Sequence, residues 1–450
     1  MVKTLREDVL RYANGKYRTE PEHLWRRFLH YAVLRHEDNR KWYGLISDGN
    51  SLSVCFPIGY TFPADDNALR RDILNLIGVL SRFSKSKDGN VTIQRIFSHE
   101  TVNFPVQAYI NIMLNYRNAN STYYMEKEVR YVTGTRGKKN WSRSIKQKKP
   151  IVQDNSFVYL DYIVQETISN DTNLITLIHE FCVYESYQKV GWLFPGNPPR
   201  KPRLQQFDKN MFLGTIYKKK REDPNDKNNA LFDNMISMIN FLGNTNTPSQ
   251  YYFGTDRFEY VWQNLIDYTF GIDEKGWFFP KTHWVLNTDK SKTNAALEPD
   301  TIMVLGNKVF VIDAKYYRYG DSTLTVHLPE STSINKQITY GEYIAHEKKF
   351  KERFGDNVKV YNAFLMPFGR YGKAFPCDEA YKHIGEAVSD WKSGNSEYEH
   401  VQGILVDIRY LMHNYIKHNE PEIQRLADVI ESAAVKSQSQ MSLKQLATVQ

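Results

Sequence analysis

Residues 297–319 read LEPDTIMVLGNKVFVIDAKYYRY, and this stretch organises the rest of the chain. Two short apolar runs flank Gly306-Asn307, a pattern typical of a β-hairpin with a two-residue turn. Alternate side chains share one face of a strand, so Asp313 and Lys315 project together. A hairpin brings the end of its second strand beside the start of its first. We therefore expect Asp300 to join them at one edge of a sheet.

Two carboxylates and a lysine at one sheet edge suit phosphodiester hydrolysis. Hard divalent cations take oxygen ligands and keep several waters, so Asp300, Asp313 and a backbone carbonyl would form a partial cage that leaves room for a phosphate. A lysine beside the ion, here Lys315, positions or helps deprotonate the attacking water. The alternative is an exposed ion pair at a strand end. The proline before Asp300, the hairpin and the flanking helices favour the nuclease.

Pro299-Asp300 followed by Asp313-Ala314-Lys315 resembles the PD-(D/E)xK pattern of the restriction-endonuclease superfamily. The resemblance implies that Asp300 and Asp313 are ligands of Mg²⁺ or Mn²⁺, that the carbonyl of Ala314 is a third ligand, and that Lys315 is the catalytic lysine. It also implies an α/β (α+β) fold in which helices flank a mixed sheet.

Two predicted helices carry further candidates for this site. Asp256–Phe270 has an apolar stripe at helical spacing, and Glu259 sits beside it. The superfamily resemblance makes Glu259 a candidate catalytic and metal-binding carboxylate; a surface glutamate is the alternative. Ser331–His346 reads as a helix that begins after Ser and Thr residues, with Lys336 and Gln337 facing the cleft. The resemblance makes Gln337 a candidate to orient the water or a phosphate.

A basic segment without acidic residues lies between Thr135 and Lys149 and contains an aromatic side chain. Contacted phosphates release counterions and a ring stacks on a base, so this mixture favours binding to nucleic acid. A solvated basic loop is the alternative. We also expect Tyr316–Tyr319 to continue the second strand of the hairpin and to track the DNA backbone. The predicted DNA-binding residues are Arg136, Lys138, Lys139, Trp141, Arg143, Lys146, Lys148, Lys149 and Arg318.

A narrower resemblance rests on RGKKNWSRSI at 136–145, KPI at 149–151 and IHEFCV at 178–183. These segments are similar to the LlaJI family of restriction endonucleases, whose members resemble the McrC subunit of modification-dependent restriction systems. The likeness implies double-stranded DNA as substrate and a McrB-like AAA+ GTPase as partner. The chain has no GxxxxGK[ST] phosphate loop, so we expect no nucleotide site in it. His179, on an apolar helical run, is predicted to be structural rather than catalytic.

Composition sets the outer limits. The 450 residues and 52.8 kDa allow two or three domains. A net charge of +8, a pI near 9.0, and 30 Tyr and 24 Phe suit a polyanionic partner, although an ordinary basic cytosolic protein remains the alternative. Three dispersed cysteines argue against disulfides or structural zinc. The N-terminus is polar and no apolar run approaches ~20 residues, so we expect a cytoplasmic protein without a membrane segment.

Prolines and charge runs set the expected domain boundaries. We expect residues 1–195 to recognise DNA or dock a partner, 196–229 to be a linker, 230–430 to form the nuclease domain, and 431–450 to be a flexible tail. Predicted helices cover Glu22–His36, Arg70–Ser86, Val102–Arg117 after Pro105, Asn173–Ser186, Ala230–Leu242 and, as a crossover, Asp378–Ser393; predicted strands cover Glu126–Val132, Phe157–Val164, Val358–Met366 and Val401–Ile408.

These features together predict a Mg²⁺-dependent DNA endonuclease of a restriction, or phage-defence, system. A homodimer would let two sites cut both strands. One alternative is a non-catalytic DNA-binding or bridging subunit that keeps the fold as a scaffold. Another is a repair or recombination nuclease of the same superfamily, which shares the chemistry and differs in substrate.

Overall fold

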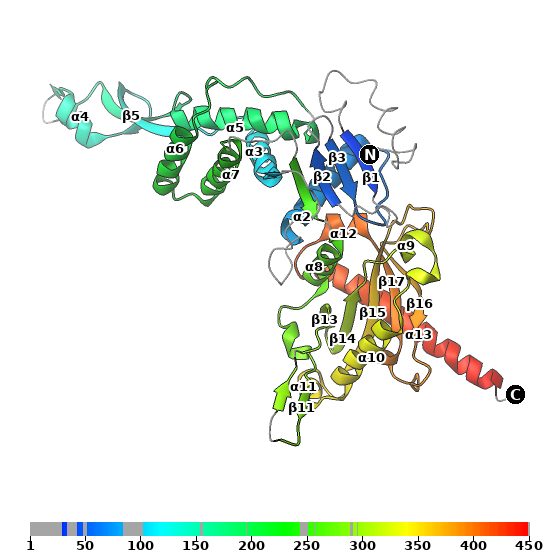
Figure 1. Cartoon of the computed structure of the whole chain (residues 1–450). Helices are drawn as coiled ribbons and strands as arrows, with labels where there is room; N and C mark the ends of the chain where they lie inside the picture. Colours follow the sequence, from blue (N-terminus) through cyan, green and yellow to red (C-terminus); the bar gives the residue numbers. More distant parts are fainter. Residues whose placement is uncertain are drawn as a thin grey trace. The chain divides into compact units, whose positions relative to one another are not determined.

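A computed structural model describes most of the chain, and its helices and strands divide between two compact units (Figure 1). Unit one joins residues 1–103 to 248–450, and unit two spans 104–247. The described residues are 29–33, 43–47, 52–83, 102–153, 156–194, 196–243, 251–255, 257–288, 291–294 and 296–448.

This division differs from the predicted boundaries, because the first hundred residues group with the nuclease core. The expected linker 196–229 is partly helical: it contains α6 (Lys209–Glu222) and the start of α7 (Asp226–Leu242). The prolines that suggested a linker lie before α6 or just after it, at Pro224, so they end the helix without preventing it.

The sheet of the nuclease core is built on the predicted hairpin. β13 (Thr301–Leu305) and β14 (Lys308–Ala314) are antiparallel, and their turn is Gly306-Asn307. Gly306 has a φ of 61°, a left-handed conformation that favours glycine. The full order is β13-β14-β15-β17-β16, where β14, β15 and β17 are parallel and the two edge strands are antiparallel to their neighbours. The predicted mixed sheet is confirmed.

Three strands complete this sheet. β15 (Lys359–Phe368) and β17 (Val401–Asp407) are the predicted apolar strands. The predicted crossover helix over Asp378–Ser393 is wrong, because β16 (Tyr381–Ala387) occupies that segment as an edge strand. Gly385 has a φ of 127° at an irregularity in the pairing of β16, which a helix would not accommodate. The predicted strand over Tyr316–Tyr319 is also wrong, since β14 ends at Ala314.

Helices cover the sheet on both faces (Figure 1). α10 (Ser331–His346) and α8 (Phe258–Phe270) match the predicted helices. α13 runs from Glu420 to Thr448, so the expected flexible tail from residue 431 is helical instead. After Pro421 the segment has no proline or glycine, and its Ala, Leu, Gln and Lys residues are good helix formers.

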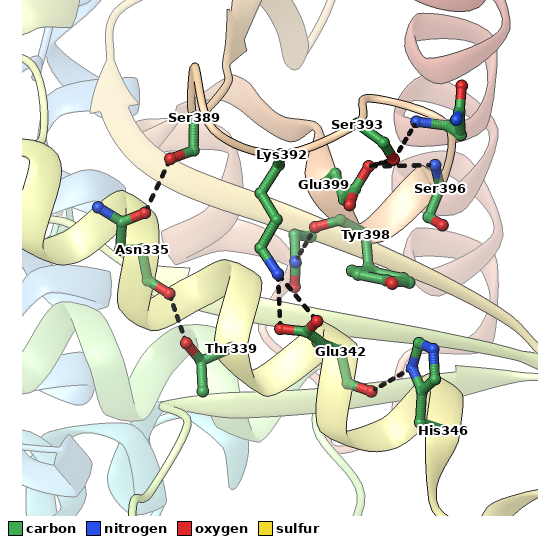
Figure 2. A network of polar contacts seen from close by, with 12 residues as sticks. Asn335, Thr339, Glu342, His346, Ser389, Lys392, Ser393, Ser396, Tyr398 and Glu399 are labelled. Atoms are coloured by element: carbon green, nitrogen blue, oxygen red, sulfur yellow. Dashed lines mark hydrogen bonds and ion pairs between the residues drawn. The ribbon is translucent and has the colours of Figure 1, made fainter.

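A loop between β16 and β17 is fixed to the outer side of α10, as Figure 2 shows. Ser389 donates a hydrogen bond to Asn335 over 3.0 Å, and the ammonium of Lys392 contacts both carboxylate oxygens of Glu342 at 2.8 Å. Within the loop, Ser393 bonds to the buried Glu399. These contacts hold α10, the helix that carries Gln337, against the sheet.

A second sheet of unit one has the order β1-β3-β2-β10-β4. The predicted helix Glu22–His36 is wrong over β1 (Leu29–Val33), which is a strand, and its other residues lie outside the described part of the chain. The remaining strands are β2 (Tyr43–Ser47), β3 (Leu52–Phe56), β4 (Val102–Asn103) and β10 (Tyr251–Thr255).

A buried ionic cluster joins the two parts of unit one. α2 (Asp66–Phe83), a predicted helix, carries Asp72, which is fully buried. Its carboxylate accepts hydrogen bonds from Tyr60 and from Arg409 Nε at 2.6 Å, and it lies 2.6 Å from His413 Nε2. Arg409 and His413 belong to α12 (Ile408–Asn414). Burial alone would raise the pKa of Asp72, but these hydrogen bonds lower it below its ordinary value.

Unit two combines packed helices with a three-stranded sheet of order β5-β9-β6. Its helices are α3 (Val106–Asn118), α5 (Leu174–Val190), α6 and α7, all predicted except α6. β5 (Glu126–Gly134) confirms a predicted strand and pairs with β9 (Tyr162–Asn170), whereas the predicted strand Phe157–Val164 is split between β8 (Ser156–Val158) and β9. The remaining short elements are β6 (Lys138–Lys139), α4 (Trp141–Gln147) and β7 (Ile151–Gln153).

His179 lies in the core of unit two and matches its predicted structural role. It is fully buried on α5, and its Nδ1 accepts a hydrogen bond from the backbone N–H of Tyr124 over 2.8 Å. Its Nε2 is buried with no hydrogen-bond partner among the described residues. Burial lowers the pKa of His179 to about 4, so the ring is neutral in the folded protein near neutral pH.

Candidate active site

The hairpin brings Asp300 and Asp313 together, as its strand pairing requires. Thr301 pairs with Ile312, so the next residues, Asp300 and Asp313, face each other at the open end of the hairpin. The backbone N–H of Ala314 donates a hydrogen bond to Oδ2 of Asp300 over 3.0 Å. One carboxylate is thereby fixed to the strand that carries the other.

Lys315 stands beside this pair. Its Nζ lies 2.7 Å from Oδ2 of Asp313, and the two side chains are 20% and 11% exposed. The backbone N–H of Lys315 donates to the carbonyl of Leu365 on β15, which fixes the position of the lysine at the end of β14. The three predicted residues of the motif therefore meet in one place.

Burial and mutual repulsion make the carboxylate pair receptive to a cation. Burial, then the hydrogen bond and negative charge of Asp313, raise the pKa of Asp300 to about 8, and the Ala314 N–H and Lys315 oppose this only in part. Two adjacent carboxylates cannot both ionise without a compensating charge. A divalent cation supplies that charge and takes oxygen ligands. Asp300, Asp313 and the carbonyl of Ala314 fit a Mg²⁺ or Mn²⁺ ion on these grounds.

Two side chains that sequence reasoning missed hold Asp300 in place. Gln263 on α8 donates through Nε2 to Oδ2 of Asp300 over 3.2 Å. Lys275 donates to the backbone carbonyl of Asp300 and to Asp267, each at 2.6 Å. Gln263 lies four residues after Glu259 and so on the same helix face, a spacing that could have marked it.

Glu259 is not grouped with the other two carboxylates. It is exposed near the start of α8, and its charge contributes to raising the pKa values of Tyr43 and Tyr316. Within the described part of the chain, no three His, Cys, Asp or Glu side chains lie close enough together to hold a metal ion. The side chain that contacts Asp300 from α8 is Gln263, one turn further along.

α10 contributes buried polar atoms next to β14. Gln337 is 1% exposed and donates through Nε2 to the carbonyl of Val311 over 2.6 Å, while its Oε1 has no partner among the described residues. Its neighbour Lys336 has a Nζ 5.5 Å from the ring of Tyr340. Burial lowers the pKa of Lys336, but Tyr340 and the two carboxylates, Asp313 and Asp300, raise it more. Lys336 is therefore a second cation near the pair.

The predicted DNA-binding residues fall into different units. Those between 136 and 149 belong to unit two, where they lie on or next to β6 and α4, and all are exposed except the half-buried Lys148. Trp141 is 53% exposed. Lys139 and Arg143 lie 3.8 Å from the rings of Tyr162 and Tyr131, respectively. Arg318 instead follows β14 in unit one, half-buried, and its Nε has no partner among the described residues.

The sequence and the site agree with one known family. The family model of the LlaJI restriction endonuclease matches residues 42–383, a range that contains Asp300, Asp313 and Lys315. The chain belongs to the LlaJI restriction endonuclease family. It is thus a member of a family of restriction-system nucleases, as the motif at the hairpin predicted.

Other similarities of this LlaJI-family chain are more limited. It is 49% identical over 41 residues to the uncharacterized protein YyaQ of Bacillus subtilis (strain 168); the match covers 9% of this chain and spans 35% of the length of that relative. A similar solved structure is a half-complex from a tetradecameric assembly of Thermococcus gammatolerans McrB AAA+ hexamers with bound McrC. It has a TM-score of 0.36 and 13% identity, and the match covers 87% of this chain and 83% of that one. None of the helices in the described ranges has the length and apolarity of a membrane span.

Proposed function

We propose that this chain is a Mg²⁺-dependent DNA endonuclease that cuts double-stranded DNA in a restriction system. The observation that carries the proposal is the meeting of Asp300, Asp313 and Lys315 at one end of the hairpin. Membership of the LlaJI restriction endonuclease family supports the same reaction class.

The residues of the site have separate proposed roles. A divalent cation on Asp300, Asp313 and the Ala314 carbonyl would lower the pKa of a bound water and offset charge on the phosphate. Lys315, next to Asp313, would donate a hydrogen bond to the attacking water or to a non-bridging phosphate oxygen. Gln337, whose Oε1 has no partner among the residues that the structure describes, would accept a hydrogen bond from that water.

Plasmid cleavage tests the proposal. Purified protein is incubated with supercoiled plasmid in Mg²⁺, Mn²⁺ or Ca²⁺, with and without a McrB-like AAA+ GTPase encoded beside it. We expect Mg²⁺ and Mn²⁺ to support cleavage, and Lys315→Ala to slow it by roughly 10²-fold or more, since positioned acid–base groups contribute on that scale. Lys359→Ala, at an exposed lysine at the other end of β15 from Leu365, is the matched control.

Each other outcome identifies an alternative. If Lys315→Ala cuts at the wild-type rate, the catalytic assignment is wrong. If wild type binds DNA but never cuts it, with or without the GTPase, the chain is a DNA-binding or bridging subunit. Cleavage restricted to DNA ends would indicate a repair or recombination nuclease.

The exposed surface of unit two supports a second role. We propose that its basic residues bind DNA, with Trp141 available to stack on a base. The adjacent β7–β8 hairpin favours a protein partner, because monomeric proteins rarely leave such apolar patches uncovered. Its exposed apolar side chains, with the exposed fraction of each, are Ile151 50%, Val152 67%, Phe157 69% and Val158 41%, and Leu160, 67% exposed, follows two residues later. A McrB-like subunit is the proposed partner, and loss of complex formation in Phe157→Ser is the test.

A further inference from the structure

A short hairpin that precedes β13 in the chain is exposed on both faces. β11 (His283–Val285) and β12 (Ser291–Thr293) pair with each other as a separate two-stranded sheet in unit one. Trp284 is 60% exposed and Val285 is 78% exposed, although their side chains point to opposite faces. An isolated hairpin is marginally stable in water, and large exposed apolar side chains mark contact surfaces. Figure 1 shows β11 projecting from the nuclease core.

One face of the hairpin combines an aromatic ring with a cation. Trp284 pairs directly with Lys292, so their side chains share a face. The described residues 279–288 and 291–294 carry Lys281, His283 and Lys292 and no acidic side chain; Asp289 lies outside the described residues. An exposed ring next to a lysine matches a nucleic-acid strand, since the cation meets a phosphate while the ring packs on a sugar or base.

Backbone hydrogen bonds connect the base of the hairpin to the segment that leads to Asp300. Asn294 donates a backbone hydrogen bond to Thr282, and Leu297 donates to Pro280, both at 2.9 Å. Only two residues separate Leu297 from Asp300. At no more than ~3.6 Å per residue, Trp284 lies within about 30 Å of Asp300 along this path. That is at most about nine base pairs of a duplex, so DNA cut at the carboxylates passes within reach of the hairpin.

Basic residues near the base of the hairpin also suit binding to DNA. Trp277, just before the hairpin, lies 4.9 Å from the guanidinium of Arg353, and its carbonyl accepts a hydrogen bond from Lys349 over 2.7 Å. Both basic residues belong to α11 (Lys348–Phe354), which also exposes Lys348 and Lys351. Trp277 therefore connects the basic helix α11 to the basic β11–β12 hairpin.

We infer that the β11–β12 hairpin is a DNA-contact element that binds the duplex within about nine base pairs of the scissile phosphate, through Trp284 and Lys292. The inference rests on the proposed nuclease function and adds to it a binding surface outside the carboxylate site. The occupant is double-stranded DNA; a second copy of the chain and a protein partner are the competing occupants.

The test measures binding separately from cleavage. A fluorescent 30-base-pair duplex is titrated with full-length protein carrying Lys315→Ala, alone and combined with Trp284→Ala or Lys292→Ala. We expect Trp284→Ala to weaken binding severalfold, because the duplex loses the contact between the ring and its sugar–phosphate backbone. Lys292→Ala should reduce the dependence of log Kd on log salt by about one unit. Trp391→Ala, at a tryptophan 73% exposed on the loop fixed to α10, is the matched control and should leave Kd unchanged.

The possible results distinguish failure of this inference from failure of the proposed function. If Trp284→Ala and Trp391→Ala bind DNA equally well, the hairpin makes no DNA contact and the inference is overturned. If DNA binding is unchanged but Trp284→Ala alters the oligomeric state or the complex with the AAA+ partner, a protein occupies the hairpin and the inference is again overturned. If wild type cuts DNA and Trp284→Ala binds and cuts DNA as well as wild type does, only the inference fails. If wild type neither binds nor cuts DNA, the proposed function is rejected.

Discussion

The backbone N–H of Ala314 hydrogen-bonds to the Asp300 carboxylate over 3.0 Å. The residue whose carbonyl is the proposed third metal ligand thus also fixes the first ligand. Because this bond joins the two strands of the hairpin, the oxygen atoms proposed to hold the cation are arranged before any ion binds. Such preorganisation is what a catalytic site requires of its ligands.

Asp300→Asn should separate metal binding from folding. The variant keeps an oxygen that accepts from Ala314 and removes one of two adjacent carboxyl groups, so we expect its metal-free Tm to equal or exceed that of wild type. Millimolar Mg²⁺ should raise the Tm of wild type by a few degrees and leave that of Asp300→Asn unchanged, because the ion binds only the folded site. Thermal melts with and without Mg²⁺ measure both effects; equal Mg²⁺ shifts would contradict the ligand role.

Lys275→Met should disturb Asp300 from outside the site. The lysine is 14% exposed and neutralises Asp267, whose Oδ1 is buried without a partner in the described structure. Losing it leaves a carboxylate and a carbonyl unpaired, and we expect the free energy of unfolding to fall by about 2–3 kcal/mol. Cleavage should slow as well, since Asp300 loses a support. Urea unfolding and plasmid cleavage measure the two effects, with Lys359→Met, at an exposed lysine, as the neutral control.

Asp72→Asn should destabilise the whole of unit one. Removing the charge leaves the buried Tyr60 and the half-buried Arg409 without the carboxylate to which they donate, a change that costs about 3 kcal/mol or more. Since Asp72 and Arg409 come from distant parts of the chain, we expect α2 and the nuclease core to lose structure together. Hydrogen exchange of both segments checks this. Asn67→Ala, exposed on the same helix, should change stability by less than about 0.5 kcal/mol.

His179 should make unit two sensitive to mild acid. Its folded pKa is about 4, below the ~6.5 of an unfolded histidine, so the unfolded chain binds more protons between these values. The stabilising contribution is complete above pH 6.5 and is lost as pH falls toward 4, by about 2 kcal/mol between pH 7.5 and 5. Urea unfolding of wild type and His179→Asn at both pH values isolates it. His346→Asn, at an exposed histidine, should retain the full wild-type pH dependence.

Local sequence patterns predicted the hairpin and the meeting of its three motif residues. Turn chemistry and strand alternation act over a few residues, so Asp300, Asp313 and Lys315 could be placed without knowledge of the rest of the fold. The same reasoning located α8 and α10, because each has a clear apolar stripe.

Local sequence patterns do not predict contacts between segments that are distant in the chain. Gln263 and Lys275 reach Asp300 because α8 and the chain after it pack along β13. The spacing of Glu259 and Gln263 marks a shared helix face but does not specify what that face packs against. The local pattern over β16 predicts a helix, whereas an edge strand owes its conformation to its neighbour, here β17. The contacts of Asp72 on α2 with Arg409 and His413 on α12 join segments far apart in the chain, which composition does not reveal.

The parallel pairing of β4 with β10 determines where the chain leaves unit one and where it returns. Val102 lies opposite Tyr251, so the chain leaves unit one and returns to it at adjacent points of one sheet. Residues 104–247 thus form an insertion between two paired strands, and a change in the length of this segment would leave the strand order of unit one intact.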